Sequence, residues 1–306
     1  MSRRDISIMS NDGIHKLHVI IWEPENEVKG VLQISHGMIE MIERYDDFAK
    51  YMNQKGYAVI GNDHLGHGLT AGREDDLGYF CSENMSATMV EDLHSVTLYA
   101  KKIYPDVPYY LLGHSMGSFL ARRYLMTYGN EPDRAIICGT GSQNNCLLII
   151  GDIVTKLIKV VKGDRYRSSF VEKYFFKGFN SRFEPARTKN DWLTKDEAVV
   201  DWYNANPYCT FSFTINGYRM IFELLRFIQN KANIAKIPNN LPIFLIAGKD
   251  DPVGHYGADI KNIYMQYKKA GVRDIACKLY KNDRHEILNE LDKEKVYADI
   301  AEWIES

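Results

Sequence analysis

The sequence lacks the features of a membrane-spanning or disulfide-bonded chain. No apolar run reaches the roughly 18 residues that a membrane-spanning helix needs. The cysteines are odd in number and form no C-x-x-C pair, so neither a disulfide framework nor a zinc site is predicted. We expect reduced, mostly buried thiols, and no metal or cofactor. The five cysteines are Cys81, Cys138, Cys146, Cys209 and Cys277.

An excess of charge of one sign is also lacking. The 38 basic and 40 acidic residues give a net charge of -2, which provides no general attraction to nucleic acid. The first residues carry no apolar core of a signal peptide, so a cytoplasmic location is the default expectation. A chain of 306 residues with 45% hydrophobic content is long enough for one large core, or for one domain with a sizeable insertion.

A G-x-S-x-G motif, Gly113 to Gly117, is the strongest chemical signal in the chain. It follows a short apolar run at 107–112, which is typical of a buried strand. Apolar residues then recur at helical spacing from Phe119 to Tyr128, and Gly129 ends the pattern. A strand, a tight turn and a helix in this order predict a nucleophile elbow with Ser115 at its corner.

Strand and helix patterns alternate along most of the chain. An antiparallel hairpin is predicted around the Asn11-Asp12-Gly13 turn. Each later strand is followed by a helical pattern, which predicts a parallel sheet with ligands beyond the carboxyl ends of its strands. The expected strands lie at 5–10, 15–23, 30–35, 57–61, 107–112, 134–138, 241–247 and 275–280. The expected core helices lie at 44–55, 84–104, 216–230, 256–270 and 291–305.

The alternation stops between residues 141 and 214, which predicts an inserted helical cap. The core is then expected in two parts, 1–140 and 215–306. Residues 146–161 are apolar nearly all round, so this segment is interpreted as a lid that lines an acyl-chain tunnel. Its basic residues leave two alternatives open: a transient contact with a membrane surface, or a cap helix packed on the core with solvated charges. These residues are Lys156, Lys159, Lys162, Arg165 and Arg167.

A serine nucleophile needs a base and a carboxylate that orients the base. Asp251 follows the predicted strand at 241–247, and His285 follows the last strand, so both are expected at the edge that carries Ser115. The chain order Ser, Asp, His is that of the α/β hydrolases. Asp250 competes with Asp251, which is favoured because Pro252 restricts its backbone.

Two other histidines follow strands. His36 precedes the nucleophile in the chain and is expected to brace its own loop. His255 comes only four residues after Asp251. His285 is therefore the preferred base.

The loop after the strand at 30–35 contributes further candidates. Gly37 allows a tight turn there, so the amides of Met38 and Met116 are predicted to form an oxyanion hole. Glu40 and Arg44 are four residues apart, and they are expected either to bind the polar end of a substrate or to brace the loop as an ion pair. The glycine-rich segment 62–68 lacks the lysine of a phosphate-binding loop and is interpreted as a structural turn.

Taken together, these segments resemble the monoacylglycerol lipase and lysophospholipase family of α/β hydrolases over nearly the whole chain. The resemblance is carried by His36-Gly37-Met38 with Glu40, Arg44 and Tyr45, by 63–68, by the elbow, by Asp251-Pro252 and by Arg284-His285-Glu286. The cap stretches 191–196 and 206–209 resemble bacterial lysophospholipases. Met41 replaces a histidine common in the family, and Leu288 replaces a group that is polar in some lipases.

The resemblance implies an α/β-hydrolase fold, with a mostly parallel eight-stranded sheet and an inserted helical cap. It implies the triad Ser115, Asp251 and His285, with oxyanion amides at Met38 and Met116. The expected activity is cofactor-independent hydrolysis of a lipid monoester, such as a monoacylglycerol or a lysophospholipid, and no nucleic-acid partner is expected. A peptidase or lactonase on the same scaffold and a non-catalytic ligand-binding receptor stay open as alternatives.

Overall fold

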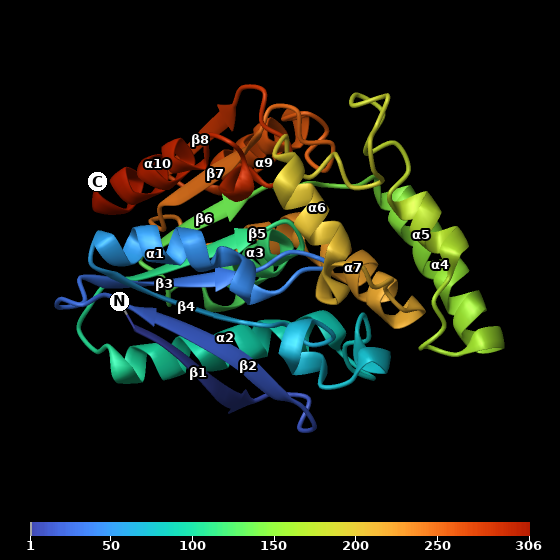
Figure 1. Ribbon diagram of the computed structural model, residues 1–306, viewed down its shortest axis with the longest axis horizontal. Helices are drawn as coiled ribbons and strands as arrows, with labels where there is room; N and C mark the ends of the chain where they lie inside the picture. The colour runs from blue at the N-terminus through green and yellow to red at the C-terminus, as the bar shows by residue number, and fades with distance from the viewer. Residues whose placement is uncertain (1) are drawn as a thin grey trace.

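The computed structural model describes residues 2–306, and its centre is one eight-stranded sheet (Figure 1). The strand order is β1-β2-β4-β3-β5-β6-β7-β8. The hairpin partners β1 and β2 are antiparallel, and β2 also runs antiparallel to β4, whereas all later neighbours are parallel. The fold is therefore that of an α/β hydrolase, as predicted. The strands are β1 (Ser2–Met9), β2 (Lys16–Glu23), β3 (Gly30–Ser35), β4 (Tyr57–Asn62), β5 (Tyr109–His114), β6 (Arg134–Cys138), β7 (Ile243–Gly248) and β8 (Ile275–Tyr280).

The helices follow the strands in alternation until β6. The α-helices are α1 (Asp46–Gln54), α2 (Met85–Ile103), α3 (Met116–Tyr128), α4 (Asn145–Lys162), α5 (Ser169–Phe175), α6 (Glu197–Ala205), α7 (Ile215–Ile228), α8 (Lys231–Ile234), α9 (Ala258–Ala270) and α10 (Lys293–Glu305). The short 3₁₀ helices are η1 (Ile42–Tyr45), η2 (Gly68–Ala71), η3 (Glu74–Asp76), η4 (Pro207–Cys209) and η5 (Ile287–Asn289).

Both faces of the sheet are covered by helices. Helices α1 and α10 pack on one face, where Phe48 and Tyr297 lie with ring centroids 4.9 Å apart. Helices α2, α3 and α9 pack on the other face. Because the central strands are buried on both sides, they are mostly apolar, as in other parallel sheets. The buried polar exceptions are Gln33, Ser35 and His114. This layering leaves the ends of the strands as the places where polar chemistry can gather.

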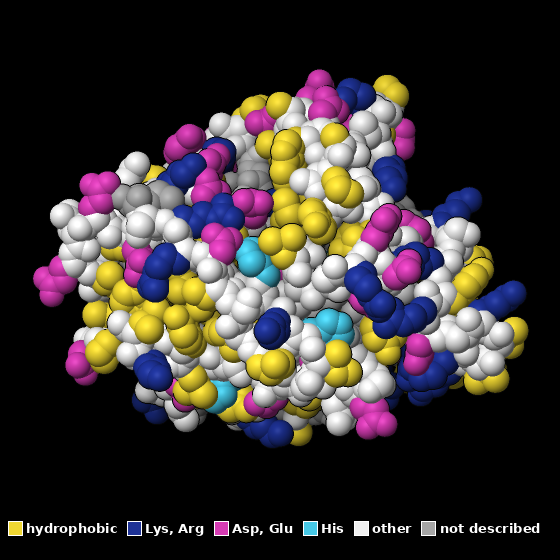
Figure 2. All heavy atoms as spheres, turned by 60° about the horizontal axis from the view of Figure 1, so that its bottom comes forward, with side chains coloured by type: hydrophobic (Ala, Val, Ile, Leu, Met, Phe, Trp, Pro, Cys, Tyr) yellow, Lys and Arg dark blue, Asp and Glu magenta, His cyan; other side chains and the backbone are white. Residues whose placement is uncertain are grey.

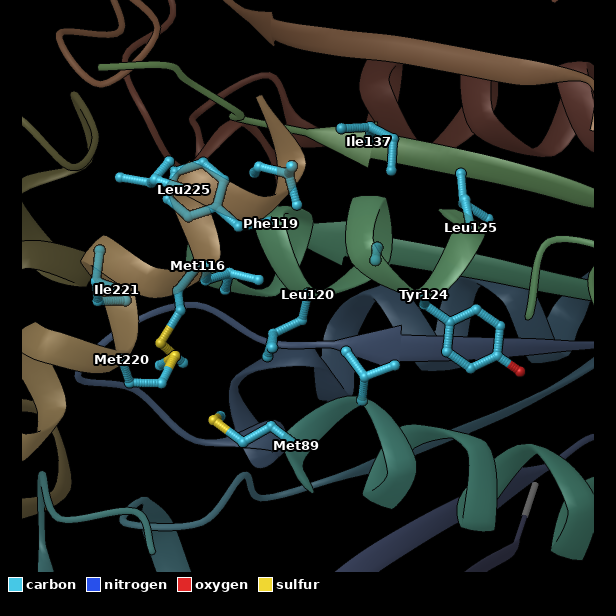
Figure 3. Close-up of a cluster of buried hydrophobic side chains, with 14 of the residues drawn as sticks. Met89, Met116, Phe119, Leu120, Tyr124, Leu125, Ile137, Met220, Ile221 and Leu225 are labelled. Carbon is cyan, nitrogen blue, oxygen red and sulfur yellow. The ribbon is translucent and has the colours of Figure 1, made fainter. Parts of the chain in front are cut away.

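The segment between β6 and β7 holds α4 to α8, and the helices α4 and α5 project at the end of the molecule opposite the two termini (Figure 1). Helix α4 contacts α7 closely at Gly151, where a Cβ atom would lie 2.8 Å from the Phe222 ring. Helix α7 in turn packs against α2 and α3: Figure 3 shows its Met220 beside Met116, with Met89 close by. The structure thus attaches the inserted helices to the core through α7. The expected cap boundaries at 141 and 214 stay a prediction.

The sequence located the elements to within about two residues, except that β1 begins at Ser2 rather than at residue 5. Of the five thiols, Cys81, Cys138 and Cys209 are buried, whereas Cys146 and Cys277 are exposed. None of the five forms a disulfide.

Candidate active site

The elbow at Ser115 has a strained backbone. Ser115 has φ 53° and ψ −121°, a region that non-glycine residues rarely occupy and that clusters at functional sites. A Cβ on Gly117 would lie 2.0 Å from the Ser35 carbonyl oxygen, and one on Gly113 would lie 2.4 Å from the Gly117 carbonyl oxygen. Both glycines are therefore steric requirements. The Ser115 amide donates to the Cys138 carbonyl over 3.0 Å, which ties the elbow to the neighbouring strand.

His285 and Asp251 meet at the same edge of the sheet. His285 Nδ1 lies 3.0 Å from Asp251 Oδ1, and the side chains are 2% and 0% exposed. The Val253 amide donates to the same carboxylate oxygen over 2.9 Å. Within residues 2–306, Asp251 Oδ2 has no hydrogen-bond partner. A buried carboxylate in this position selects the imidazole tautomer that carries its proton on Nδ1, which leaves Nε2 able to accept a proton.

The serine and the histidine lie on neighbouring segments. Gly139 follows Cys138, which accepts the Ser115 amide, and a Cβ on Gly139 would lie 3.3 Å from His285 Cε1. The rings of His114 and His285 are 4.9 Å apart between centroids. Ser115 is partly exposed, and its hydroxyl makes no hydrogen bond to any group in residues 2–306.

The two candidate oxyanion amides differ from their neighbours by having no acceptor. Gly37 donates its amide to Glu40 Oε1 over 2.5 Å, and Ile39 donates its amide to His67 Nε2 over 3.3 Å. Between them, the Met38 amide has no acceptor among residues 2–306, and the same holds for Met116 at the start of α3. Unpaired amides beside a nucleophile can stabilise the negative oxygen that forms during acyl transfer.

Glu40 and Arg44 belong to a buried ion-pair cluster. Arg44 donates to Glu40 Oε2 over 2.8 Å and to both carboxylate oxygens of Glu286 over 2.7 and 2.6 Å. All three side chains are 3% exposed. Burial alone would lower the pKa of Arg44, but the carboxylates of Glu286 and Glu40 raise it well above its usual value. These contacts match the loop-bracing alternative, and the substrate-binding alternative stays a prediction.

His114 joins this cluster from inside the elbow. Its Nδ1 lies 3.3 Å from Glu40 Oε1 and 3.1 Å from the Tyr45 hydroxyl oxygen. Burial favours neutral forms of both groups, yet their mutual contact raises the pKa of His114 and, with the charge of Arg44, lowers the pKa of Glu40. These contacts hold in place the residue that precedes Ser115.

Three buried histidines support the loop that carries Met38. His36 Nε2 accepts the His64 amide over 2.9 Å, and the rings of His36 and His64 lie 4.2 Å apart. His67 Nδ1 lies 3.0 Å from the Leu65 carbonyl oxygen, which leaves its Nε2 to accept the Ile39 amide. Burial lowers the pKa of all three, that of His67 to about 3. His36 thus braces its loop, as expected.

The remaining competitors lie elsewhere. His255 is 57% exposed and pairs with Asp259 over 2.8 Å. Asp250 is partly exposed, and its amide donates to the Asp283 carbonyl. Segment 62–68 forms a turn in which the Asp63 carboxylate accepts the Leu69 amide over 2.9 Å, in agreement with the structural interpretation.

Sequence reasoning gave no role to residues 191–195, which pack on the His285 loop. Trp192 lies with its ring centroid 5.1 Å from that of His285. The Leu193 carbonyl accepts the Glu286 amide over 2.7 Å, and Lys195 donates to Asp283 over 2.7 Å. Arg284 donates to the carbonyl oxygens of Asp191 and Thr194. The signal was the motif-like stretch 191–196, but a sequence pattern does not show which loop such a stretch contacts.

A family model described as "Serine aminopeptidase, S33" matches residues 26–292. The chain belongs to this family. The matched range includes the elbow, the buried ion-pair cluster and the His285 loop, so the whole site lies inside the family's common part.

Curated relatives and solved structures agree with the family. "Monoglyceride lipase" of Rattus norvegicus is 23% identical over 92% of this chain and 84% of its own length. "Monoacylglycerol lipase" of Mycolicibacterium smegmatis is 22% identical over 94% and 91%. A thermostable carboxyl esterase from Bacillus coagulans, solved in complex with glycerol, superposes with a TM-score of 0.92 at 28% identity and covers 100% of this chain and 98% of its own. This member of the serine aminopeptidase family is thus a hydrolase, as predicted.

The substitution Arg44→Met distinguishes the two predicted roles of Glu40 and Arg44, which are bracing of the loop and binding of the polar end of a substrate. Removing the guanidinium leaves Glu40 and Glu286 buried without their common partner, so we expect the free energy of unfolding to fall by about 3 kcal/mol. Urea denaturation monitored by circular dichroism measures this. Lys50→Met, which breaks an exposed pair with Asp46, should leave the unfolding midpoint unchanged. An unchanged stability of Arg44→Met, together with a raised KM, would instead support substrate binding.

The buried histidines predict a loss of stability in acid. Because the pKa of His67 is lowered to about 3, the unfolded chain takes up a proton below about pH 6.5 while the folded chain does not. The free energy of unfolding that the neutral, buried His67 contributes is present in full above about pH 6.5 and is lost progressively as the pH falls to about 3. The wild type and His67→Leu should both lose stability between about pH 7 and about pH 5, as measured by urea denaturation at each pH. Because the variant lacks the His67 imidazole, its free energy of unfolding should fall by about 2 kcal/mol less than that of the wild type. Parallel pH dependences in the two proteins would contradict the buried, neutral state of His67.

Proposed function

We propose that the protein is a cofactor-independent serine carboxylic-ester hydrolase that acts on lipid monoesters, either monoacylglycerols or lysophospholipids. The proposed triad is Ser115, His285 and Asp251. The observation that carries the proposal is the buried contact between His285 Nδ1 and Asp251 Oδ1 over 3.0 Å, at the edge where Ser115 has the strained backbone of an elbow. A nucleophile, a base and a group that orients the base are the minimum for this chemistry.

In the proposed mechanism, His285 Nε2 takes the proton of Ser115 as Oγ attacks the ester carbonyl carbon. The imidazolium that results is stabilised by Asp251. The Met38 and Met116 amides donate to the carbonyl oxygen as it becomes negative, which contributes roughly 3 kcal/mol per donor in comparable sites. His285 then protonates the leaving alcohol, and water, activated by the same histidine, hydrolyses the acyl-enzyme.

The surroundings of His285 favour a substrate with an apolar chain. Trp192 lies over the His285 ring, and Phe179 meets Trp192 edge to face with centroids 4.8 Å apart. Phe176 packs on Phe179 in the same way over 5.6 Å. Aromatic rings in contact with the base give the acyl chain of a lipid a surface to bury. The monoglyceride and monoacylglycerol lipases among the relatives support the same substrate class.

Two alternatives predict different behaviour. The family description names an aminopeptidase, so a peptidase on this scaffold has a specific observation behind it. A binding protein that does not turn over its ligand needs no oriented histidine beside a serine, and the buried Asp251 favours catalysis over this alternative.

We expect the hydrolysis of p-nitrophenyl esters to peak at medium or long acyl chains. Ser115→Ala and His285→Ala should each lower kcat by at least about 10⁴-fold, because each removes a step of the proton relay. Ser142→Ala is the matched control and should keep the full rate. The same panel tests an aminoacyl p-nitroanilide: cleavage of the anilide without cleavage of the long-chain esters would identify a peptidase, and no labelling of Ser115 by a fluorophosphonate would exclude the serine mechanism.

We further propose that the cap contacts membranes through the outer face of α4. Leu157, Val160 and Val161 are 64%, 85% and 76% exposed. Three large apolar side chains exposed side by side on one helix are unusual on the surface of a globular protein. Figure 2 shows hydrophobic side chains in yellow beside basic ones at the same end of the molecule. The basic residues named above contribute less, since Lys156 and Lys159 each pair with an aspartate over 2.7 Å. No helix in residues 2–306 is long and apolar enough to cross a bilayer. The proposed contact is therefore superficial.

The double variant Leu157→Ser with Val161→Ser should bind phosphatidylcholine vesicles at least about ten-fold more weakly than the wild type, because it removes two side chains that would enter the bilayer surface. Vesicle flotation measures the bound fraction. Leu291→Ser replaces a leucine that is 66% exposed far along the chain from the cap, and it should leave binding unchanged. Equal losses in the two variants would contradict a specific role of α4.

A further inference from the structure

A polar hollow lies between α4 and α7, away from the triad. Its volume is about 690 Å³, and α2 and α3 also contribute to its wall. None of the proposed catalytic residues lines it. The lining includes four basic and two acidic side chains, which are Arg123, Lys156, Arg219, Arg226, Asp152 and Glu223.

The hollow borders the exposed apolar face of α4. Asn145, Ile149, Asp152 and Lys156 line it, and their spacing places them on one stripe of the helix. The core side of α4, marked by Leu148 and Thr155, flanks this stripe. At 100° per residue, the exposed apolar side chains from Ile150 to Val161 flank it on the other side. Ile149 is both a lining residue and 46% exposed. Any outside surface that covers the exposed apolar side chains of α4 therefore also contacts the rim of the hollow.

Hydrogen-bond donors outnumber acceptors in the hollow. The Arg219 and Arg226 guanidinium groups approach Asp164 and Asp152 no closer than 3.6 and 3.7 Å, which is beyond hydrogen-bond distance. Arg219 Nε is buried and has no partner in residues 2–306. Asp164 Oδ1, 3.6 Å from Arg219, is likewise buried without a hydrogen-bond partner, whereas Arg226 is half exposed. Neither guanidinium group therefore donates to an acceptor of residues 2–306 at hydrogen-bond distance, and both can receive one from outside the chain.

Two side-chain amides add further hydrogen-bond donors without acceptors. The oxygen of Asn145 accepts from Gln229, and that of Asn230 caps the Ala232 amide. No acceptor for either NH₂ group is present in residues 2–306. An acceptor-rich anion fits such a site better than a neutral ligand does, and guanidinium groups bind phosphate oxygens in pairs.

Arg123 forms the floor of the hollow. Its guanidinium lies 4.0 Å from the centroid of the Phe227 ring and 3.3 Å from Glu223. Its Nη1 also donates to the Ser86 hydroxyl, which in turn donates to Glu223. Burial lowers the pKa of Arg123, and Glu223 offsets this in part, so a second anion in the hollow would further stabilise this guanidinium.

We propose that this hollow binds the phosphate group of an anionic phospholipid headgroup, in which no cationic group of the lipid itself neutralises the phosphate, from the same lipid surface that receives the apolar face of α4. The proposal rests on the α4 contact of the proposed function, but not on the esterase activity. The lipid source is favoured over a free phosphate because the rim of the hollow continues into the exposed apolar face, so that one surface can fill both.

Vesicle flotation of the full chain tests the proposal with three compositions: phosphatidylcholine alone, phosphatidylcholine with phosphatidylglycerol, and phosphatidylcholine with oleate at the same mole fraction. The comparison is made at a pH well above the pKa of oleate in a bilayer, so that both lipids carry one negative charge. We then expect phosphatidylglycerol to strengthen binding more than oleate, because a phosphate offers more acceptor oxygens than a carboxylate does. In Arg219→Gln with Arg226→Gln, the gain from phosphatidylglycerol should fall by about ten-fold. Arg226→Gln alone, at a half-exposed site, provides the same test with less risk to folding.

The matched control is Lys162→Gln with Lys173→Gln, which removes the same charge from exposed positions of α4 and α5. Its gain from phosphatidylglycerol should fall by no more than about two-fold. Equal losses in the two double variants, or equal effects of phosphatidylglycerol and oleate, would overturn the proposal and leave only general charge attraction. Arginine-dependent binding of free glycerol 3-phosphate by calorimetry, without any effect of phosphatidylglycerol, would overturn the lipid source. In these binding experiments, Ser115→Ala should bind the vesicles as strongly as the wild type does, because the hollow does not include the triad.

Discussion

Arg44 makes the contact on which the geometry of this site depends. It bonds Glu40, which fixes the Gly37 amide beside the oxyanion loop, and it bonds Glu286, the neighbour of His285. One guanidinium therefore joins two loops that lie 242 residues apart in the chain. Inside the protein such a pair gains little net free energy, but leaving either carboxylate without its partner is costly. The distance between the loop of the proposed oxyanion amide Met38 and the loop of the proposed base His285 therefore depends on two ion pairs that share one buried guanidinium.

The inserted helices reach the site through a second set of bonds to the same loops. Tyr203 donates to the Ile39 carbonyl over 2.8 Å, and Lys195 donates to Asp283 over 2.7 Å. These bonds hold the cap segment with Trp192 on the ring of His285. By contrast, α4 meets the core through apolar packing, with Leu148 inside the core cluster and Gly151 against the Phe222 ring. The inner part of the cap is fixed by directional bonds, whereas the outer helix is held by packing.

The sequence was sufficient for the parts of the fold that are set locally. The elbow is a local steric requirement, so Gly113 and Gly117 reveal it without knowledge of their neighbours. Strand periodicity and chain order then brought Asp251 and His285 to one edge, and their 3.0 Å contact agrees with that expectation. The partners of Arg44 and the place of Trp192 could not be predicted in this way, because they depend on loop contacts between distant segments. The i, i+4 spacing of Glu40 and Arg44 predicted their contact, but no sequence pattern indicated that Glu286 is the third member of this cluster.

The exposure of α4 is the other feature that the sequence left open, and it has a physical origin. A helix that is apolar nearly all round is normally buried on all sides, but within residues 2–306 α4 packs chiefly against α7. The opposite side of α4 is left in water, and the stripe between the two sides faces the hollow, where α3 and α7 place three guanidinium groups. Water solvates an exposed valine poorly, whereas the surface of a lipid bilayer can bury it. An anionic lipid surface also offers acceptors to guanidinium groups, so one environment suits both the apolar side of α4 and the hollow beside it.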